Sequence, residues 1–126
     1  MVNTLESAII PTYYEIKQET KTKYTSVLSR AEVRELVAKY DWDVEIMTAI
    51  FMAESSGQST VVNYKDNHRV CVGSVGIAQV ACLHVDDPEK LKDPVYNIEI
   101  AYMLWKRDGI NIWGAFTDKR YLKFMI

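Results

Sequence analysis

The chain has 126 residues, the size of one ordinary domain, which excludes most multidomain enzymes. With 48% apolar residues, 25% charged residues and only 5 Gly and 3 Pro, the composition is globular and excludes a fibrous or disordered chain. The 15 Lys and Arg against 17 Asp and Glu give a net charge of -2, so no basic surface indicates a nucleic-acid partner. No apolar run approaches the roughly 20 residues that span a bilayer, and we expect no membrane span.

The first 28 residues differ in character from the rest of the chain. Residues 17–23 are dense in Lys, Thr, Glu and Gln, and no apolar periodicity is sustained. We therefore expect an N-terminal arm or linker over residues 1–28 and one folded domain over residues 29–126. Residues 1–10 lack the basic head and apolar stretch of a secretory signal, so no signal peptide is predicted.

Two helix starts follow the arm. Ser29 and Glu32 match a capping box, in which each residue satisfies a free backbone donor of the other, and this predicts a helix over residues 31–40. Asp43 is a suitable N-cap for a second helix over residues 44–54.

The second of these helices presents an apolar face that ends in a carboxylate. Met47, Ile50 and Phe51 follow helical spacing, and Glu54 takes the next position on the same face. An unpaired buried charge costs several kcal/mol and favours protonation, so Glu54 is a candidate acid. Gly57 lies just beyond and suits a left-handed helix end.

The middle of the chain contains β-prone segments. Residues 60–62 and 69–72 favour strands, and residues 65–67 between them have turn character, which predicts a small hairpin. Residues 76–83 are expected to form a short, largely buried helix.

The last long element is expected to be the central helix. Asp93 and Pro94 suit a helix start and Gly109 a helix end, which predicts a helix over residues 94–107. Residues 113–121 are expected to form a short aromatic helix and turn. The predicted fold class is mainly α, a helical domain with a small β-hairpin element.

Two cysteines and two histidines are close together in the sequence, as His68, Cys71, Cys82 and His84. They allow one disulfide, two semi-buried thiols, or four ligands of a zinc-stabilised interaction domain. The sequence favours a disulfide or two thiols over the zinc set, because Cys-x-His is an unusual spacing for zinc modules, and it does not choose between the disulfide and the thiols.

Four short motifs follow the arm in a fixed order, and together they resemble the lysozyme-like superfamily: soluble lytic transglycosylases, goose-type lysozymes and phage muralytic domains. The resemblance covers about residues 29–121. The motifs are Ala53-Glu54-Ser55 at a helix end, Ser-x-Gly-φ-φ-Gln-φ at residues 74–80, Asn97-Ile98 in a helix, and the aromatic pair Trp113 and Phe116.

The resemblance implies an α+β lysozyme-like fold with a substrate cleft, and cleavage of the β-1,4 bond between N-acetylmuramic acid and N-acetylglucosamine in peptidoglycan. Glu54 would be the general acid that protonates the glycosidic oxygen. Chicken-type lysozymes have an aspartate at the place of Ser74, so its absence favours a lytic transglycosylase that leaves 1,6-anhydro ends. Asp66 is the one candidate for a base that activates water, which keeps a hydrolytic lysozyme as the alternative.

The same resemblance, with the residue chemistry, predicts which side chains contact the sugar. Amides can bind acetamido groups or satisfy buried backbone, and aromatic rings can stack on sugars or fill the core. For Tyr121, a hydrogen bond to Glu54 is a further possibility that the resemblance implies. The predicted substrate-binding residues are Ser55, Ser74, Gly76, Gln79, Asn97, Tyr102, Trp113 and Tyr121.

No cofactor or metal is required by this mechanism, and the expected partner is the glycan strand of peptidoglycan. We expect a monomer that acts in the periplasm or on the cell wall, either free or carried by a virion, with the N-terminal arm as the attachment to an assembly. A non-catalytic module on the same fold, which binds glycan or protein, is the competing interpretation.

Overall fold

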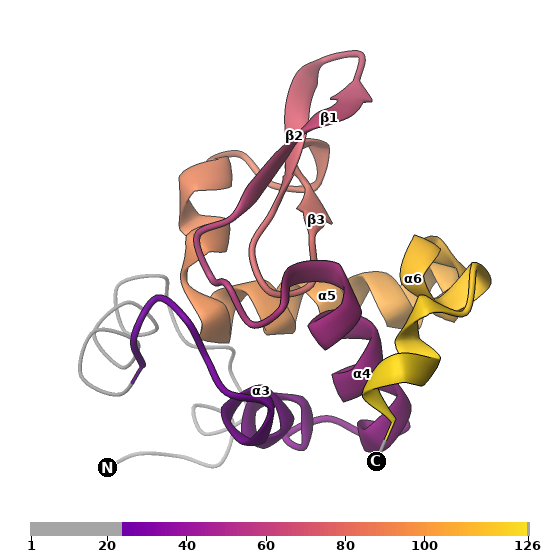
Figure 1. Ribbon diagram of the computed structural model, residues 1–126. Helices are drawn as coiled ribbons and strands as arrows, with labels where there is room; N and C mark the ends of the chain where they lie inside the picture. The colour runs from indigo at the N-terminus through magenta and orange to yellow at the C-terminus, as the bar shows by residue number, and fades with distance from the viewer. Residues whose placement is uncertain (1–23, 126) are drawn as a thin grey trace, which may run out of the picture.

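The computed structural model describes residues 24–125, in which helices combine with one small antiparallel sheet (Figure 1). The predicted arm therefore lies largely outside the described residues. The sheet stands on one side of the helices, with α4 (Val44–Ser55) and α5 (Pro94–Asp108) beneath it and the C-terminal segment beside α4 (Figure 1). The helices are α3 (Arg30–Val37), α4 (Val44–Ser55), α5 (Pro94–Asp108) and α6 (Gly114–Thr117). The strands are β1 (Val62–His68), β2 (Cys71–Val75) and β3 (Val80–Ala81). The short 3-10 helices are η1 (Cys82–His84), η2 (Pro88–Lys92), η3 (Ile110–Ile112) and η4 (Arg120–Phe124).

The helix starts are those that the sequence predicts. At α3 the Glu32 amide donates to Ser29 Oγ at 3.2 Å, and the Ser29 amide donates to Glu32 Oε1 at 2.9 Å, which confirms the capping box. At α4 the Ile46 amide donates to Asp43 Oδ1 at 3.0 Å. Each cap satisfies backbone donors that have no partner inside the helix.

The end of α4 is held against the segment that precedes α3. Ser56 and Gly57 both have left-handed backbone, with φ of 55° and 81°, and end the helix. The Leu28 amide donates to the Gly57 carbonyl at 2.8 Å, and a Cβ at Gly57 would lie 2.1 Å from the Leu28 carbonyl oxygen. Tyr24 and Leu28 are buried in the core. Residues 24–28, which the sequence assigns to the arm, are thus packed on the folded body.

The hairpin is present, but its turn is not at the predicted place. Residues 65–67 belong to β1, where the register with β2 shifts between Asn63 and Asn67. The chain reverses after His68, with Arg69 in the left-handed region at φ 50°, and the Arg69 amide donates to Asn67 Oδ1 at 3.2 Å. The local Asn67 hydrogen bond sets the turn at residues 69–70, later in the chain than turn propensity alone indicates.

The predicted helix over residues 76–83 is wrong. Gly76 and Gln79 have φ of 77° and 51°, both left-handed, so the segment forms a turn that leads into β3. A continuous right-handed helix cannot include such residues. Among the residues of this segment, the structure forms a helical turn only in η1.

Asn97 of α5 holds this turn in place. It is fully buried, accepts a hydrogen bond from the Ala78 amide at 2.8 Å, and donates to the carbonyls of Val75 and Leu91 at 2.8 and 2.9 Å. A Cβ at Gly76 would lie 2.5 Å from Asn97 Nδ2, so the close approach requires glycine. One amide thus joins α5 to the sheet and to η2.

The core lies between the helices and the sheet, with two tryptophans hydrogen-bonded inside it. Trp42 Nε1 donates to the Val37 carbonyl at 2.7 Å, and Trp113 Nε1 donates to the Ala78 carbonyl at 2.9 Å. Phe51 packs edge to face against both rings. Burial of these rings fixes the C-terminal segment onto α4 and the turn at Ala78. Within residues 24–125 no helix has the length and apolar character needed to cross a bilayer.

Candidate active site

Glu54 lies in the last turn of α4, half-buried where α6 meets the helix. Its Oε2 atom accepts a hydrogen bond from the Ala115 amide at 3.1 Å. Burial raises the pKa of the Glu54 carboxyl, and the Ala115 amide and the positive charge of Arg120 offset part of this rise. The negative charges of Asp118 and Asp66 raise the pKa further. The carboxyl is therefore anchored through one oxygen and favours the protonated form more than an exposed glutamate does.

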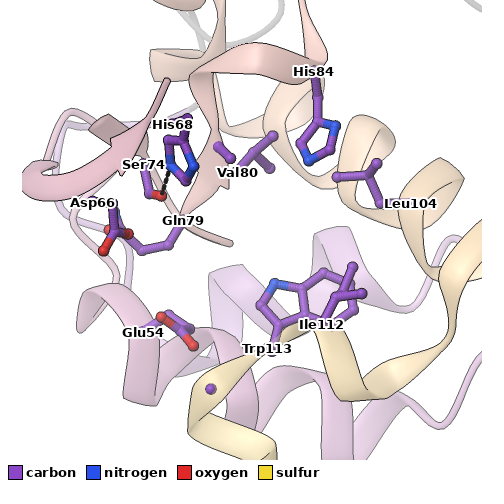
Figure 2. Close-up of a pocket in the computed structure, with 12 residues that line it drawn as sticks. Glu54, Asp66, His68, Ser74, Gln79, Val80, His84, Leu104, Ile112 and Trp113 are labelled. Carbon is purple, nitrogen blue, oxygen red and sulfur yellow. Dashed lines mark hydrogen bonds between the residues drawn. The ribbon is translucent and has the colours of Figure 1, made fainter. Parts of the chain in front are cut away.

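Glu54 faces a cavity of about 300 Å³ between α4, the sheet and the segment after α5 (Figure 2). This cavity, which we call the main cavity because more of the predicted site residues line it than line its neighbour, continues into a larger space of about 490 Å³ that Arg120, Asn63 and Val61 border, and the two share Glu54, Asp66, Gln79 and Gly114. The main cavity is lined by Glu54, Asp66, His68, Ser74, Gln79, Val80, Ala81, His84, Leu104, Ile112, Trp113 and Gly114.

Five predicted site residues come together here: Glu54, Asp66, Ser74, Gln79 and Trp113. Asp66 extends from β1 on the same side of the cavity as Glu54, and Trp113 lies opposite (Figure 2). Gln79 Nε2 donates to the Gly76 carbonyl at 3.1 Å, which orients the amide; among the described residues none donates to its oxygen. The cavity thus combines two carboxyls, a free amide oxygen and an indole.

The other predicted substrate-binding residues lie elsewhere. Ser55 is buried and donates to the Phe51 carbonyl at 3.0 Å. Gly76 is buried within the turn described above, and Asn97 is buried beneath it. Tyr102 donates to Asp41 and stacks on Tyr40, and does not line the cavity.

Tyr121 also lies outside the main cavity. Its ring stacks on Phe116 with centroids 5.2 Å apart. Among residues 24–125, the donor to the Glu54 carboxyl is the Ala115 amide rather than the Tyr121 hydroxyl. The packing of Tyr121 on α6 accounts for its position.

Two histidines, His68 and His84, also line the main cavity, although the sequence analysis did not include them among the predicted sugar-binding residues. His68 Nε2 and Ser74 Oγ are 3.4 Å apart on neighbouring strands. Burial and the positive charge of Arg107 lower the pKa of His84, which favours the neutral imidazole. In the sequence, the cysteines near these histidines suggested a metal site. A sheet this short has no periodic sequence pattern from which cavity-lining residues could be predicted.

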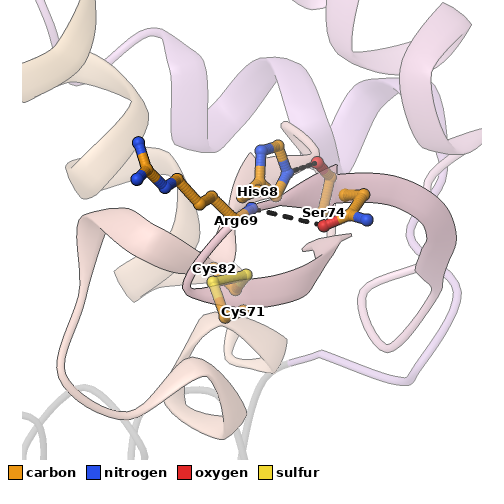
Figure 3. Close-up of a disulfide and its surroundings, with 6 residues drawn as sticks. His68, Arg69, Cys71, Ser74 and Cys82 are labelled. Carbon is orange, nitrogen blue, oxygen red and sulfur yellow. Dashed lines mark hydrogen bonds between the residues drawn. A yellow bond between two sulfur atoms is a disulfide. The ribbon is translucent and has the colours of Figure 1, made fainter.

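A disulfide joins Cys71 at the start of β2 to Cys82 of η1, with the two Cα atoms 6.3 Å apart (Figure 3). The proposed zinc set is therefore wrong, because both sulfurs are bonded to each other and neither is a thiolate ligand. Across residues 24–125 no group of three or more His, Cys, Asp and Glu side chains is placed to hold a metal ion. The bond links the strand that leads to Ser74 with the turn that carries His84.

Removal of this disulfide is expected to destabilise the protein. Cys71 and Cys82 are 11 residues apart in the sequence, and a loop of this size gives about 3 kcal/mol through its effect on the unfolded chain. The double variant Cys71→Ala and Cys82→Ala should lower the free energy of unfolding by that amount in urea titrations. The wild type unfolded in reducing agent should show the same loss, and an unchanged urea midpoint in both cases would contradict the prediction.

No protein-family model, curated protein or solved structure matches the chain. The chemistry of the cavity is therefore argued from its own residues.

Proposed function

We propose that this protein cleaves the glycan strands of peptidoglycan at the β-1,4 bond between N-acetylmuramic acid and N-acetylglucosamine, with Glu54 as general acid and then base. The observation that supports this most is the state of Glu54, half-buried at a cavity, anchored by the Ala115 amide and with a raised pKa. A glycosidic oxygen is a poor leaving group unless it is protonated, and a carboxyl of raised pKa is the group that does this near neutral pH. The motifs that resemble lysozyme-like proteins support the same substrate.

We propose a lytic transglycosylase route. The Glu54 carboxyl donates its proton to the glycosidic oxygen as the bond from the muramyl C1 breaks. The carbonyl oxygen of the muramyl acetamido group stabilises the cation at C1. Glu54, now a carboxylate, takes the proton of the muramyl C6 hydroxyl, whose oxygen attacks C1 and closes a 1,6-anhydro ring. Glu54 ends the cycle protonated, and no water is consumed.

Asp66 supports a second candidate, hydrolysis. Asp66 lines both adjoining cavities together with Glu54, so its carboxylate borders the space where a water molecule could attack C1. In that route Asp66 takes a proton from water and the product has a reducing end. The two routes differ in whether one water is added to the product.

The disulfide supports a place of action outside the reducing cytoplasm. Disulfides form and persist in oxidising environments such as the periplasm and cell or virion surfaces. We propose that the protein acts in the periplasm or on the cell wall. A lysozyme-like fold, with the main cavity as part of a substrate cleft between helices and sheet, completes the proposal.

Mass spectrometry of digested peptidoglycan tests the function and separates the two routes. We expect the wild type to release muropeptides lighter by one water than hydrolytic products. Asp66→Asn should release the same products at a similar rate, as should the control Asp86→Asn, an exposed residue outside the cavities.

Two other outcomes would contradict the proposal, the first its transglycosylase route and the second catalysis itself. Reducing ends that disappear in Asp66→Asn would establish hydrolysis with Asp66 as the base. Binding of glycan without any release would establish a non-catalytic module.

A further inference from the structure

A smaller cavity adjoins the main cavity on the side opposite Glu54. It has about 180 Å³ and is lined by His84, Ile100, Met103, Leu104 and Arg107. We call it the side groove. His84 and Leu104 also line the main cavity, and Figure 2 shows both side chains across the main cavity from Glu54. The side groove is therefore a lateral extension of the main cavity.

The lining of the side groove differs from that of the main cavity. Ile100, Met103 and Leu104 of α5 give it an aliphatic wall, and Met103 remains 51% exposed. A sugar ring carries hydroxyls, and each polar group buried without a partner costs roughly 1–3 kcal/mol. The side groove thus favours a ligand with small apolar groups over a further sugar.

A positive group borders the aliphatic wall. Arg107 uses Nε and Nη2 on Asp108, at 3.0 and 2.6 Å, and among the described residues nothing accepts from Nη1. A guanidinium has five N–H donors, so those on Nη1 can bind a carboxylate. The imidazole of His84 offers a further hydrogen bond at the junction with the main cavity.

We propose that the side groove binds the peptide that peptidoglycan carries on the lactyl group of its muramyl residues. This inference rests on the proposed function, which places a muramyl residue in the main cavity. The peptide branches sideways from the sugar and begins with alanine and an acidic residue, so it brings a small methyl group and a carboxylate. These match the aliphatic wall and Arg107. The protein then selects glycan that still carries its peptides.

The test compares two substrates with the same glycan strand, one with its peptides and one stripped of them by an amidase. We expect kcat/KM of the wild type to be roughly tenfold higher on the peptide-bearing strand, the usual effect of one apolar contact in a pocket. Met103→Glu places a negative charge in the side groove, and should remove this preference while cleavage of the stripped strand is unchanged. Leu122→Glu, 52% exposed in the wild type and outside the cavities, is the matched control.

A second variant tests the side groove without a change at Met103. Arg107→Gln should lower the same preference because the carboxylate loses its charged donor. Equal kcat/KM of the wild type on the two strands would overturn the inference, and so would an equal loss on both strands in Met103→Glu. In either case cleavage itself persists and the proposed function stands. Absence of cleavage of both strands by the wild type would instead overturn the proposed function, and the inference with it.

Discussion

Glu54→Gln is expected to abolish peptidoglycan cleavage while the fold persists. The amide has no acidic proton to give to the glycosidic oxygen, and loss of general acid–base catalysis lowers kcat by roughly 10²–10⁴-fold. The glutamine oxygen can still accept from the Ala115 amide, so the contact between α4 and α6 remains. Chromatography of the muropeptides released at equal enzyme concentration measures this loss of activity. Glu45→Gln on the same helix is the control, and should leave activity within about twofold because Glu45 lies outside the cavities and pairs with Arg34 and Arg30 at the surface.

The stability of Glu54→Gln provides an independent check. The pKa of Glu54 is raised in the folded state, so its contribution favours folding at low pH and is lost as pH rises through the folded pKa. Glutamine carries no charge at any pH. At neutral pH the variant should therefore unfold at the same or a higher temperature than the wild type, as catalytic residues often lower stability. Full activity of the variant would exclude Glu54 as the acid, and an inactive variant with a much lower unfolding temperature would leave loss of fold as the cause.

Asn97→Ala is expected to have the largest effect on stability. It removes three buried hydrogen bonds and leaves the Ala78 amide without a partner. Each buried group left unpaired costs roughly 1–3 kcal/mol, so a total of about 4 kcal/mol is expected, a large share of the about 5–15 kcal/mol that stabilises a domain. Urea unfolding measures this loss.

The control for Asn97→Ala is Asn111→Ala, an exposed residue of η3 that should change stability by less than about 0.5 kcal/mol. The turn that Asn97 holds carries Gln79 into the main cavity, so activity should fall even where the variant remains folded. Equal stability of the Asn97 and Asn111 variants would show that the turn is held by its other contacts.

The helices could be predicted because their signals are local. The Ser29 and Glu32 capping box and the Asp43 cap depend on residues within one turn, and the structure contains both. Glu54 stands at the end of an apolar helical face, which makes it a candidate, but it is the resemblance of the motifs that follow it to lysozyme-like proteins that selects it as the acid. In the structure Glu54 is half-buried, and this burial raises the pKa of its carboxyl.

The rest could not be predicted because it depends on contacts between distant residues. The apolar residues at 76–83 resemble a buried helix, but Asn97 lies about twenty positions later and bonds the Ala78 amide in a turn. The same contact explains Gly76, whose role is to admit Asn97 rather than a ligand. Tyr102 has the residue type of a sugar contact, and only the packing of α5 shows that it faces Tyr40.

The hydrogen bond between Glu54 and Ala115 also determines when the site can exist. The two residues are 61 positions apart, and Trp113 beside Ala115 packs on Phe51 of the Glu54 helix. During synthesis, α4 leaves the ribosome long before the segment that anchors its carboxyl. Until that segment docks, Glu54 remains hydrated and acidic, with the ordinary properties of a surface glutamate. A chain interrupted before α6 would therefore contain the proposed catalytic residue without the hydrogen bond that anchors its carboxyl.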